Sequence, residues 1–172
     1  DIDAAKLLRT PVWIRLKRGL PVKDTKQQYV PPLDIPGIVS SFEYVGPLAL
    51  AARKDRGAVY RAVVAPRMWL ASISHRSRIF LAKTVPNIVS GLLQDAGLED
   101  NKDFEIQAGS RDYRSREYTT QYQETDLDFL SRLLEQDGFF YYFDFGGGRD
   151  RLVVGDNATA LPDSGLKLVY RP

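Results

Sequence analysis

Apolar and polar residues alternate through most of the first half of the chain, a period of two that is typical of β-strands with one buried face. Residues 11–19 give the clearest case, since valine, isoleucine and leucine alternate there with tryptophan, arginine and lysine. The same period recurs in residues 37–47, 58–66 and 68–80, whereas residues 22–36 are polar and Pro-rich and predict a loop. Short strands at this spacing predict a barrel or a sandwich. They are too few to close a barrel, so we expect further strands outside these 172 residues.

Two later segments space their apolar residues by three and four, which predicts amphipathic helices. The first helix follows Thr84 as N-cap and carries Pro86 in its first turn, where a missing N–H costs nothing. We expect it to end before Gly97, which suits the left-handed position after a helix. The second helix follows Thr125 and ends at Gly138. Its predicted buried face consists of Leu127, Phe129, Leu130, Leu133 and Leu134.

Strands are predicted around the second helix in residues 115–124, 139–145 and 150–156, the last two joined by three glycines. This order predicts an α+β fold class with a terminal hairpin. Six of the seven residues in 139–145 are aromatic, a density that could stack bases, bind a sugar, form a partner interface or fill a core. Alternation places four on one apolar face: Phe139, Tyr141, Phe143 and Phe145. We interpret this face as packed under the helix, with Tyr142 as the outward contact residue and sugar binding as an alternative.

Net charge is +2, but residues 1–83 carry 15 Lys and Arg against 6 Asp and Glu, a balance of +9. Residues 84–172 carry 9 against 16, a balance of −7. The two halves should therefore attract each other, within one subunit or between subunits. The basic residues are scattered singly through apolar alternation, so they do not favour a nucleic-acid partner. No apolar run is long enough to cross a bilayer.

Candidate catalytic groups are few. His75 is the only histidine and lies close in sequence to Ser72, Ser74 and Ser77, but there is no Gly-x-Ser-x-Gly elbow, and we interpret His75 as a partly exposed strand residue. The acidic pairs invite a glycosidase or metal interpretation. We instead expect Asp126 and Asp128 to be first-turn partners of the helix dipole, and Asp150 and Asp156 to be turn residues. The segment GGGRD lacks the Lys-Ser/Thr of a phosphate loop, and cysteine is absent. We predict no catalytic, cofactor-binding or metal-binding residue.

Four segments resemble the VgrG family, the valine–glycine repeat spike proteins of bacterial type VI secretion. The most specific are SREYTTQYQETDLDFLSRLLEQDGFFYYF and, before it, RIFLAKTVPNIVSGLLQDAGL. PGIVSSFEYVG resembles a strand of the family's first barrel, and GDNATALPDSGLKLVYRP resembles the stretch after the hairpin. The resemblance covers essentially the whole chain. His75 and the length of the loop at Val22–Pro36 depart from the family pattern.

The resemblance implies a phage tail hub-like module, with part of a first antiparallel β-barrel in residues 1–83 and a helix plus a strand–helix–hairpin unit in residues 84–172. It implies a homotrimer that docks on Hcp-type tail tube rings, with baseplate components and secreted effectors as further partners. It also implies a cytoplasmic protein that the apparatus later secretes without a cleaved signal peptide. If the two charged halves meet across subunits, salt should weaken the trimer. Alternatives are the baseplate hub of a contractile phage or prophage tail, and an enzyme such as a cell-wall hydrolase.

Overall fold

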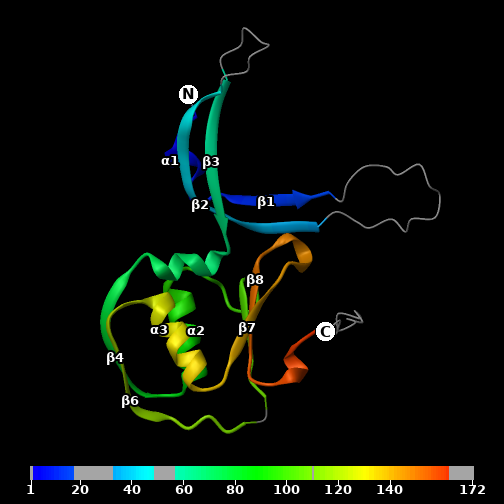
Figure 1. Cartoon of the computed structure of the whole chain (residues 1–172). Helices are drawn as coiled ribbons and strands as arrows, with labels where there is room; N and C mark the ends of the chain where they lie inside the picture. The colour runs from blue at the N-terminus through cyan, green and yellow to red at the C-terminus, as the bar shows by residue number, and fades with distance from the viewer. Residues whose placement is uncertain (1, 18–32, 49–56, 110, 163–172) are drawn as a thin grey trace, which may run out of the picture.

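The computed structural model describes residues 2–17, 33–48, 57–109 and 111–162. Its strands form three small sheets, ordered β1–β2–β3, β4–β6 and β5–β8–β7. The first sheet projects from the other elements, which gather around two helices (Figure 1). This mixture of helices and mainly antiparallel strands confirms the predicted α+β fold class. The elements in chain order are α1 (Ala4–Leu7), β1 (Pro11–Leu16), β2 (Leu33–Leu48), β3 (Gly57–Ala65), η1 (Arg67–Ser72), β4 (His75–Lys83), α2 (Val85–Asp95), β5 (Phe104–Gln107), β6 (Arg116–Thr125), α3 (Asp126–Gln136), β7 (Phe140–Asp144), η2 (Gly146–Gly148), β8 (Arg151–Gly155) and η3 (Ala158–Ala160).

β2 is a long strand that changes partner near its middle. Its first part pairs with β1 as far as Ile38, and its second part pairs with β3 from Ile38 onward. The two ribbons therefore leave the junction in different directions (Figure 1). Glycine is required at position 37 because a Cβ on Gly37 would lie 2.7 Å from the carbonyl oxygen of Ala65.

Two predictions for this first sheet need correction. The loop predicted at residues 22–36 is wrong in its last four residues, which begin β2 and pair with β1, while the remainder lies outside the described residues. The strand predicted at residues 11–19 is present in residues 11–16 as β1, with residues 18–19 outside the described residues, but it has no half-buried face. Ile14 is 43% exposed and Leu16 is 51% exposed, because in the described part of the chain β1 is an edge strand with little packed on it.

The strand predicted at residues 68–80 is wrong in its first half. A 3-10 helix, η1, follows Pro66 and occupies this half, and β4 begins only at His75. The physical reason is a spacing of three, since Met68 and Ala71 lie one 3-10 turn apart and are both buried. η1 packs these residues against α3.

Both predicted helices are confirmed, together with their ends. Thr84 and Thr125 each accept a hydrogen bond through Oγ1 from the third helical N–H, at 3.4 and 3.0 Å. Gly97 and Gly138 follow the helices with φ angles of 88° and 72°, which favour glycine. The helix residues in the core are Val85, Ile88, Val89, Leu92 and Leu93 of α2, and Phe129, Leu130, Leu133 and Leu134 of α3. Leu127, predicted to be buried, is only half-buried.

The predicted hairpin is confirmed as β7 and β8, joined by η2. The prediction for the faces of the aromatic strand is wrong in part. Phe139 is buried, but Tyr141 is 42% exposed, and Tyr142 is half-buried with its hydroxyl donating to the carbonyl of Ala160 at 2.9 Å. The reason is that β8 is the central strand, since β5 pairs with it in parallel on the other side. β8 therefore carries the fully buried residues and β7 is left at the edge.

Candidate assembly surface

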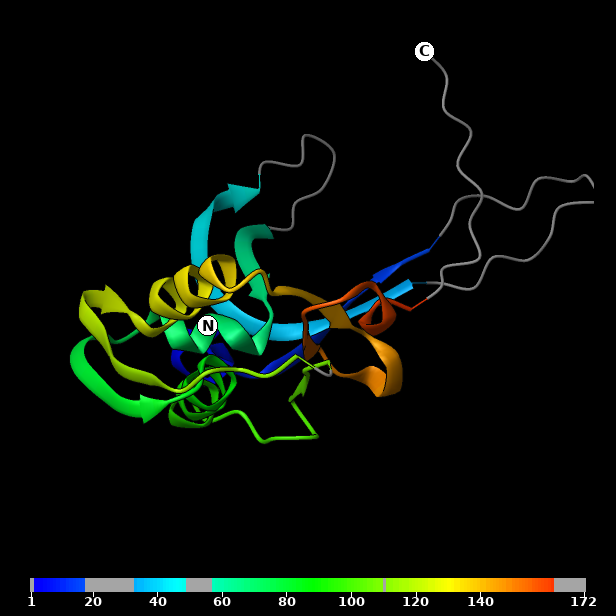
Figure 2. The same ribbon diagram turned by 90° about the horizontal axis from the view of Figure 1, so that it is seen from below.

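The outer face of the two-stranded sheet β4–β6 is apolar and exposed. It carries Ile79, Leu81, Tyr118 and Tyr122, which are 65%, 67%, 66% and 70% exposed, the highest values among the large apolar side chains of the described residues. Leu81 and Tyr118 lie directly opposite each other in the ladder. The sheet curls around the outer side of the two helices, away from the hairpin of β7 and β8 (Figure 2). We call these four residues the β4–β6 face.

The inner face of the same sheet is largely polar. Arg76, Arg78, Thr119 and Gln121 point toward the helices, and Phe80 is the one large apolar residue that joins them, stacked on an α3 aromatic ring with centroids 5.6 Å apart. The usual distribution is the reverse, with apolar residues inside and polar residues outside. An exposed apolar face of this kind is a candidate surface for contact with a protein partner. Alternation of Arg, Gln and Thr with Ile, Leu and Tyr in β4 and β6 shows from the sequence that one face is polar and the other apolar, but not which face meets the helices.

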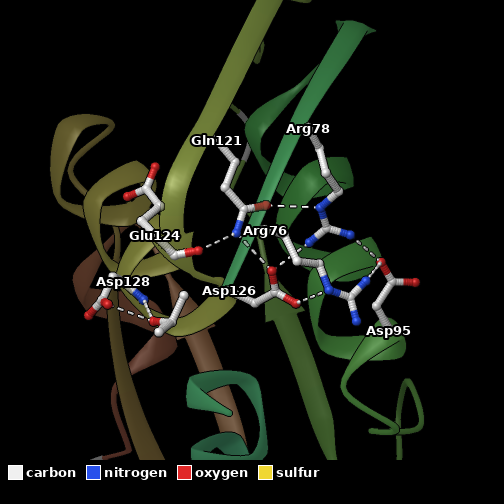
Figure 3. Close-up of polar contacts among 8 residues, drawn as sticks. Arg76, Arg78, Asp95, Gln121, Glu124, Asp126 and Asp128 are labelled. Atoms are coloured by element: carbon white, nitrogen blue, oxygen red, sulfur yellow. Dashed lines mark hydrogen bonds and ion pairs between the residues drawn. The ribbon is translucent and has the colours of Figure 1, made fainter. Parts of the chain in front are cut away.

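Asp126 is the centre of the polar inner face (Figure 3). It is 2% exposed, and its Oδ1 accepts from Arg78 Nη2 at 2.7 Å and from Gln121 Nε2 at 2.8 Å. Arg76 Nε lies 3.6 Å from its other oxygen, and Arg78 also binds Asp95 at 2.6 Å. The prediction that Asp126 acts only on the helix dipole is therefore too narrow, because its carboxylate balances two partly buried guanidinium groups.

A second cluster joins η1 to the start of β8. Asp150 is 2% exposed and accepts a hydrogen bond from the backbone N–H of Arg67. Arg67 Nη1 lies 3.2 Å from Asp150 Oδ1 and 3.1 Å from Asp103 Oδ1, and Arg149 lies 3.2 Å from the same Asp103 oxygen. Asp150 is thus a buried ion-pair residue, not a simple turn residue as predicted.

Asp156, the other predicted turn residue, anchors the segment between β5 and β6. It accepts hydrogen bonds from the hydroxyl of Tyr113 and from the N–H of Gly109, the latter at 3.0 Å. The hydrogen bond from Tyr113 holds the pKa of Asp156 below its usual value. Burial of the hydroxyl, and to a smaller extent the same hydrogen bond, raise the pKa of Tyr113 to about 12. Both groups therefore keep this contact across the neutral range.

The residues considered for a serine triad do not form one. His75 lies exposed at the start of β4. Ser72 donates to a carbonyl of its own 3-10 helix at 2.7 Å, and Ser77 accepts from the N–H of Gln123 at 3.1 Å. In the described parts of the chain no hydrogen bond joins His75 to a serine, and no three acidic or histidine side chains converge as metal ligands. No helix in those parts is long and apolar enough to span a bilayer.

The first sheet presents further exposed apolar residues. Trp13, Leu33 and Tyr44 are 58%, 53% and 59% exposed, although the indole N–H of Trp13 donates to the carbonyl of Gly148 at 3.2 Å. Among the described strands, β1 and β3 each leave one edge unpaired. Open strand edges and apolar outer faces in the described parts of the chain are features of one class of protein, a β-rich module with surface suited to further protein contacts.

Comparison with known proteins agrees with this class. The chain belongs to the phage tail baseplate hub (GPD) family, whose profile matches residues 1–172. Among its relatives are two type VI secretion system spike proteins of Pseudomonas aeruginosa. VgrG5 is 38% identical over 120 residues, and VgrG1a is 36% identical over 144 residues. These matches cover 68% and 81% of this chain but only 15% and 22% of the relatives.

A solved structure supports the same fold. It is the Escherichia coli c3393 protein, described as a type VI secretion component similar to the T4 bacteriophage tail proteins gp27 and gp5. It is 28% identical with a TM-score of 0.62, covering 74% of this chain and 34% of that protein. A further relative, the actin cross-linking toxin VgrG1 of Vibrio cholerae, is 38% identical over 102 residues, which are 9% of its length. The relatives therefore share this segment within much longer proteins.

Proposed function

We propose that this chain is a structural segment of a type VI secretion spike, and that it forms part of a trimeric hub that docks on Hcp-type tail tube rings. The observation that supports this most is the β4–β6 face, whose apolar side chains point outward over a polar inner face. The proposed division is a partial barrel in residues 1–83 and an α+β unit in residues 84–172. The β4–β6 sheet crosses this boundary and joins the two parts.

A three-fold ring requires two different patches on each subunit, because each subunit presents one patch to each neighbour. The β4–β6 face supplies the first patch. The exposed side chains of the first sheet, among them Trp13, Leu33 and Tyr44, supply the second. Baseplate components and effectors are further partners in this proposal. The protein remains in the cytoplasm until the apparatus fires, and it is then secreted without cleavage of a signal peptide.

Sedimentation of the purified chain tests the trimer. At about 100 μM, where a contact with a Kd of tens of micromolar is visible, we expect a trimer. The double variant Leu81→Asp/Tyr122→Asp should be monomeric, since it places two charges in the apolar contact. Leu161→Asp/Tyr141→Asp is a matched control that changes exposed residues of the same types elsewhere, and it should stay trimeric. A monomeric wild-type chain, or equal effects of the two variants, would contradict the proposal.

The second candidate function is the baseplate hub of a contractile phage or prophage tail, which the description of the matching family favours. Cosedimentation separates the two candidates. A spike hub should bind assembled Hcp-type rings and not a phage tail tube protein. The reverse preference would favour the phage hub, and in both cases the chain remains a structural component.

A further inference from the structure

A second surface is formed by the segment between β5 and β6 together with Arg116, the first residue of β6, and it includes none of the four residues of the β4–β6 face. Five of its residues, between positions 111 and 116, line a cavity of about 380 Å³ together with Asp137 at the end of α3. Three of the five are arginines, namely Arg111, Arg114 and Arg116. The half of the chain that contains them carries only 9 basic residues against 16 acidic ones. With Asp112 and Asp137 also in the lining, the cavity has a net charge of +1, within a half of the chain whose balance is −7.

The arginines have more donors than this chain uses. Arg116 pairs with the carboxylate of Asp137, and Arg111 Nη1 donates to the backbone carbonyl of Asp137 at 3.0 Å. A guanidinium group carries five N–H donors, so both retain free ones. Arg114 is exposed and forms no hydrogen bond or ion pair with any other residue that the structure describes. The cavity thus offers a ligand cationic donors that no described residue of the chain occupies.

The segment that carries Arg111 and Arg114 is held in place by contacts of Tyr113 and Gly109 with the rest of the protein. The ring of Tyr113 stacks on Phe139 with centroids 5.3 Å apart, and its hydroxyl donates to Asp156. Asp156 also accepts from the N–H of Gly109 at 3.0 Å. The guanidinium of Arg111 lies over the Tyr113 ring, 5.8 Å from its centroid. Because these contacts already order the segment, a ligand would lose less of its binding free energy to ordering it.

The signs of the charges indicate the chemical class of the ligand. Two carboxylates, Asp112 and Asp137, alternate with the arginines in the lining. Three arginines against two carboxylates give the lining a net charge of only +1, which attracts a nucleic acid weakly because a nucleic acid carries a phosphate at every step. The ring of Tyr113 is stacked on Phe139 and has the guanidinium of Arg111 beside it, so it is poorly placed to stack on a base as well. A peptide suits the cavity better, since its acidic side chains are separate and its N–H groups can donate to Asp112.

We propose that the cavity at Arg111, Arg114 and Arg116 binds an acidic peptide segment of a partner protein. Arginine forms paired, charge-assisted hydrogen bonds with carboxylates, which fixes both the position and the direction of such a segment. The site does not use the β4–β6 face, so a monomeric chain should bind the peptide as well as a trimer does.

Fluorescence anisotropy with labelled hexaglutamate, at about 50 mM NaCl to limit screening, tests the site. We expect the double variant Arg111→Gln/Arg114→Gln to raise the Kd about tenfold or more. A tenfold change corresponds to the loss of about one charge-assisted hydrogen bond. The control Lys6→Gln/Lys17→Gln removes the same charge from exposed residues elsewhere and should change binding little. Circular dichroism checks that both variants remain folded.

Labelled hexaglutamine and a labelled hexathymidylate complete the experiment. Neither should bind as tightly as hexaglutamate. An equal loss of hexaglutamate affinity in the arginine double variant and in the lysine double variant would show that only net charge matters. That result would overturn the proposed site. Tighter binding of the oligonucleotide, or no binding of hexaglutamate up to about 1 mM, where a free energy near −4 kcal/mol would still be visible, overturns it as well.

Discussion

Single carboxylates determine how the two oppositely charged halves of this chain meet. Asp126 is 2% exposed and lies between Arg76 and Arg78, which come from the basic half. Taking such ions out of water is costly, and the cost is recovered only when every partner is present. Removing the charge of Asp126 therefore leaves the partly buried Arg78 with only the more exposed carboxylate of Asp95.

We predict that Asp126→Asn lowers the free energy of unfolding by about 2–4 kcal/mol, because Arg78 then loses its buried counter-ion. Urea unfolding followed by circular dichroism measures this change. Glu43→Gln is the control, since Glu43 forms a surface pair with Arg61 in which both side chains are more than half exposed. It should change stability by about 0.5 kcal/mol or less. Similar values for the two variants would show that the buried pair contributes no more than a surface pair.

Tyr113 offers a second prediction at the residue scale. Burial and the hydrogen bond to Asp156 raise its pKa from 10.0 to about 12. The contact therefore stabilises the fold fully below pH 10 and is lost as the pH rises through 12. In a titration with ¹³Cζ-labelled tyrosine, the resonance missing from Tyr113→Phe should still be neutral at pH 11. Asp156→Asn should lower its midpoint while leaving it above 10.0, since burial remains. A wild-type midpoint at 10.0 with intact circular dichroism would contradict this account.

At the scale of elements, local signals made the helices predictable and non-local pairing made the remainder difficult. The ends of α2 and α3 depend on residues within one turn, such as Thr84 and Gly97, and these follow directly from the sequence. The sequence of η1 predicts a strand because alternation and a spacing of three overlap in so short a segment. β5 has four residues, and its partner β8 lies more than forty residues later, so no local pattern shows their parallel pairing.

The β4–β6 face is likewise only partly predictable from local sequence patterns. Alternation in β4 and β6 is visible in the sequence, but it does not show which face is covered by the helices. The position of Asp126 at the start of α3 decides this, because it draws Arg76, Arg78 and Gln121 inward. The apolar residues of both strands must then point outward. The β4–β6 face is thus a consequence of the buried ion pair.

At the scale of the whole molecule, buried ion pairs join the two charged halves within one chain, in the parts that the structure describes. Arg67 binds Asp103 and Asp150, while Arg76 and Arg78 bind the acidic residues at α2 and α3. The β4–β6 face has no charged side chain among its four residues. We therefore expect apolar contacts, and not the opposite charges of the two halves, to hold the proposed trimer together.

The last prediction follows from this difference. Raising NaCl from about 0.1 to 1 M shortens the screening length from about 10 to 3 Å, which weakens charge contacts between exposed groups. It does not weaken the burial of apolar surface. Sedimentation equilibrium should therefore find the trimer of the wild-type chain intact at both salt concentrations. A trimer that dissociates at high salt would show that the basic half of one subunit contacts the acidic half of its neighbour, and that the ion pairs within the chain leave enough charge for that contact.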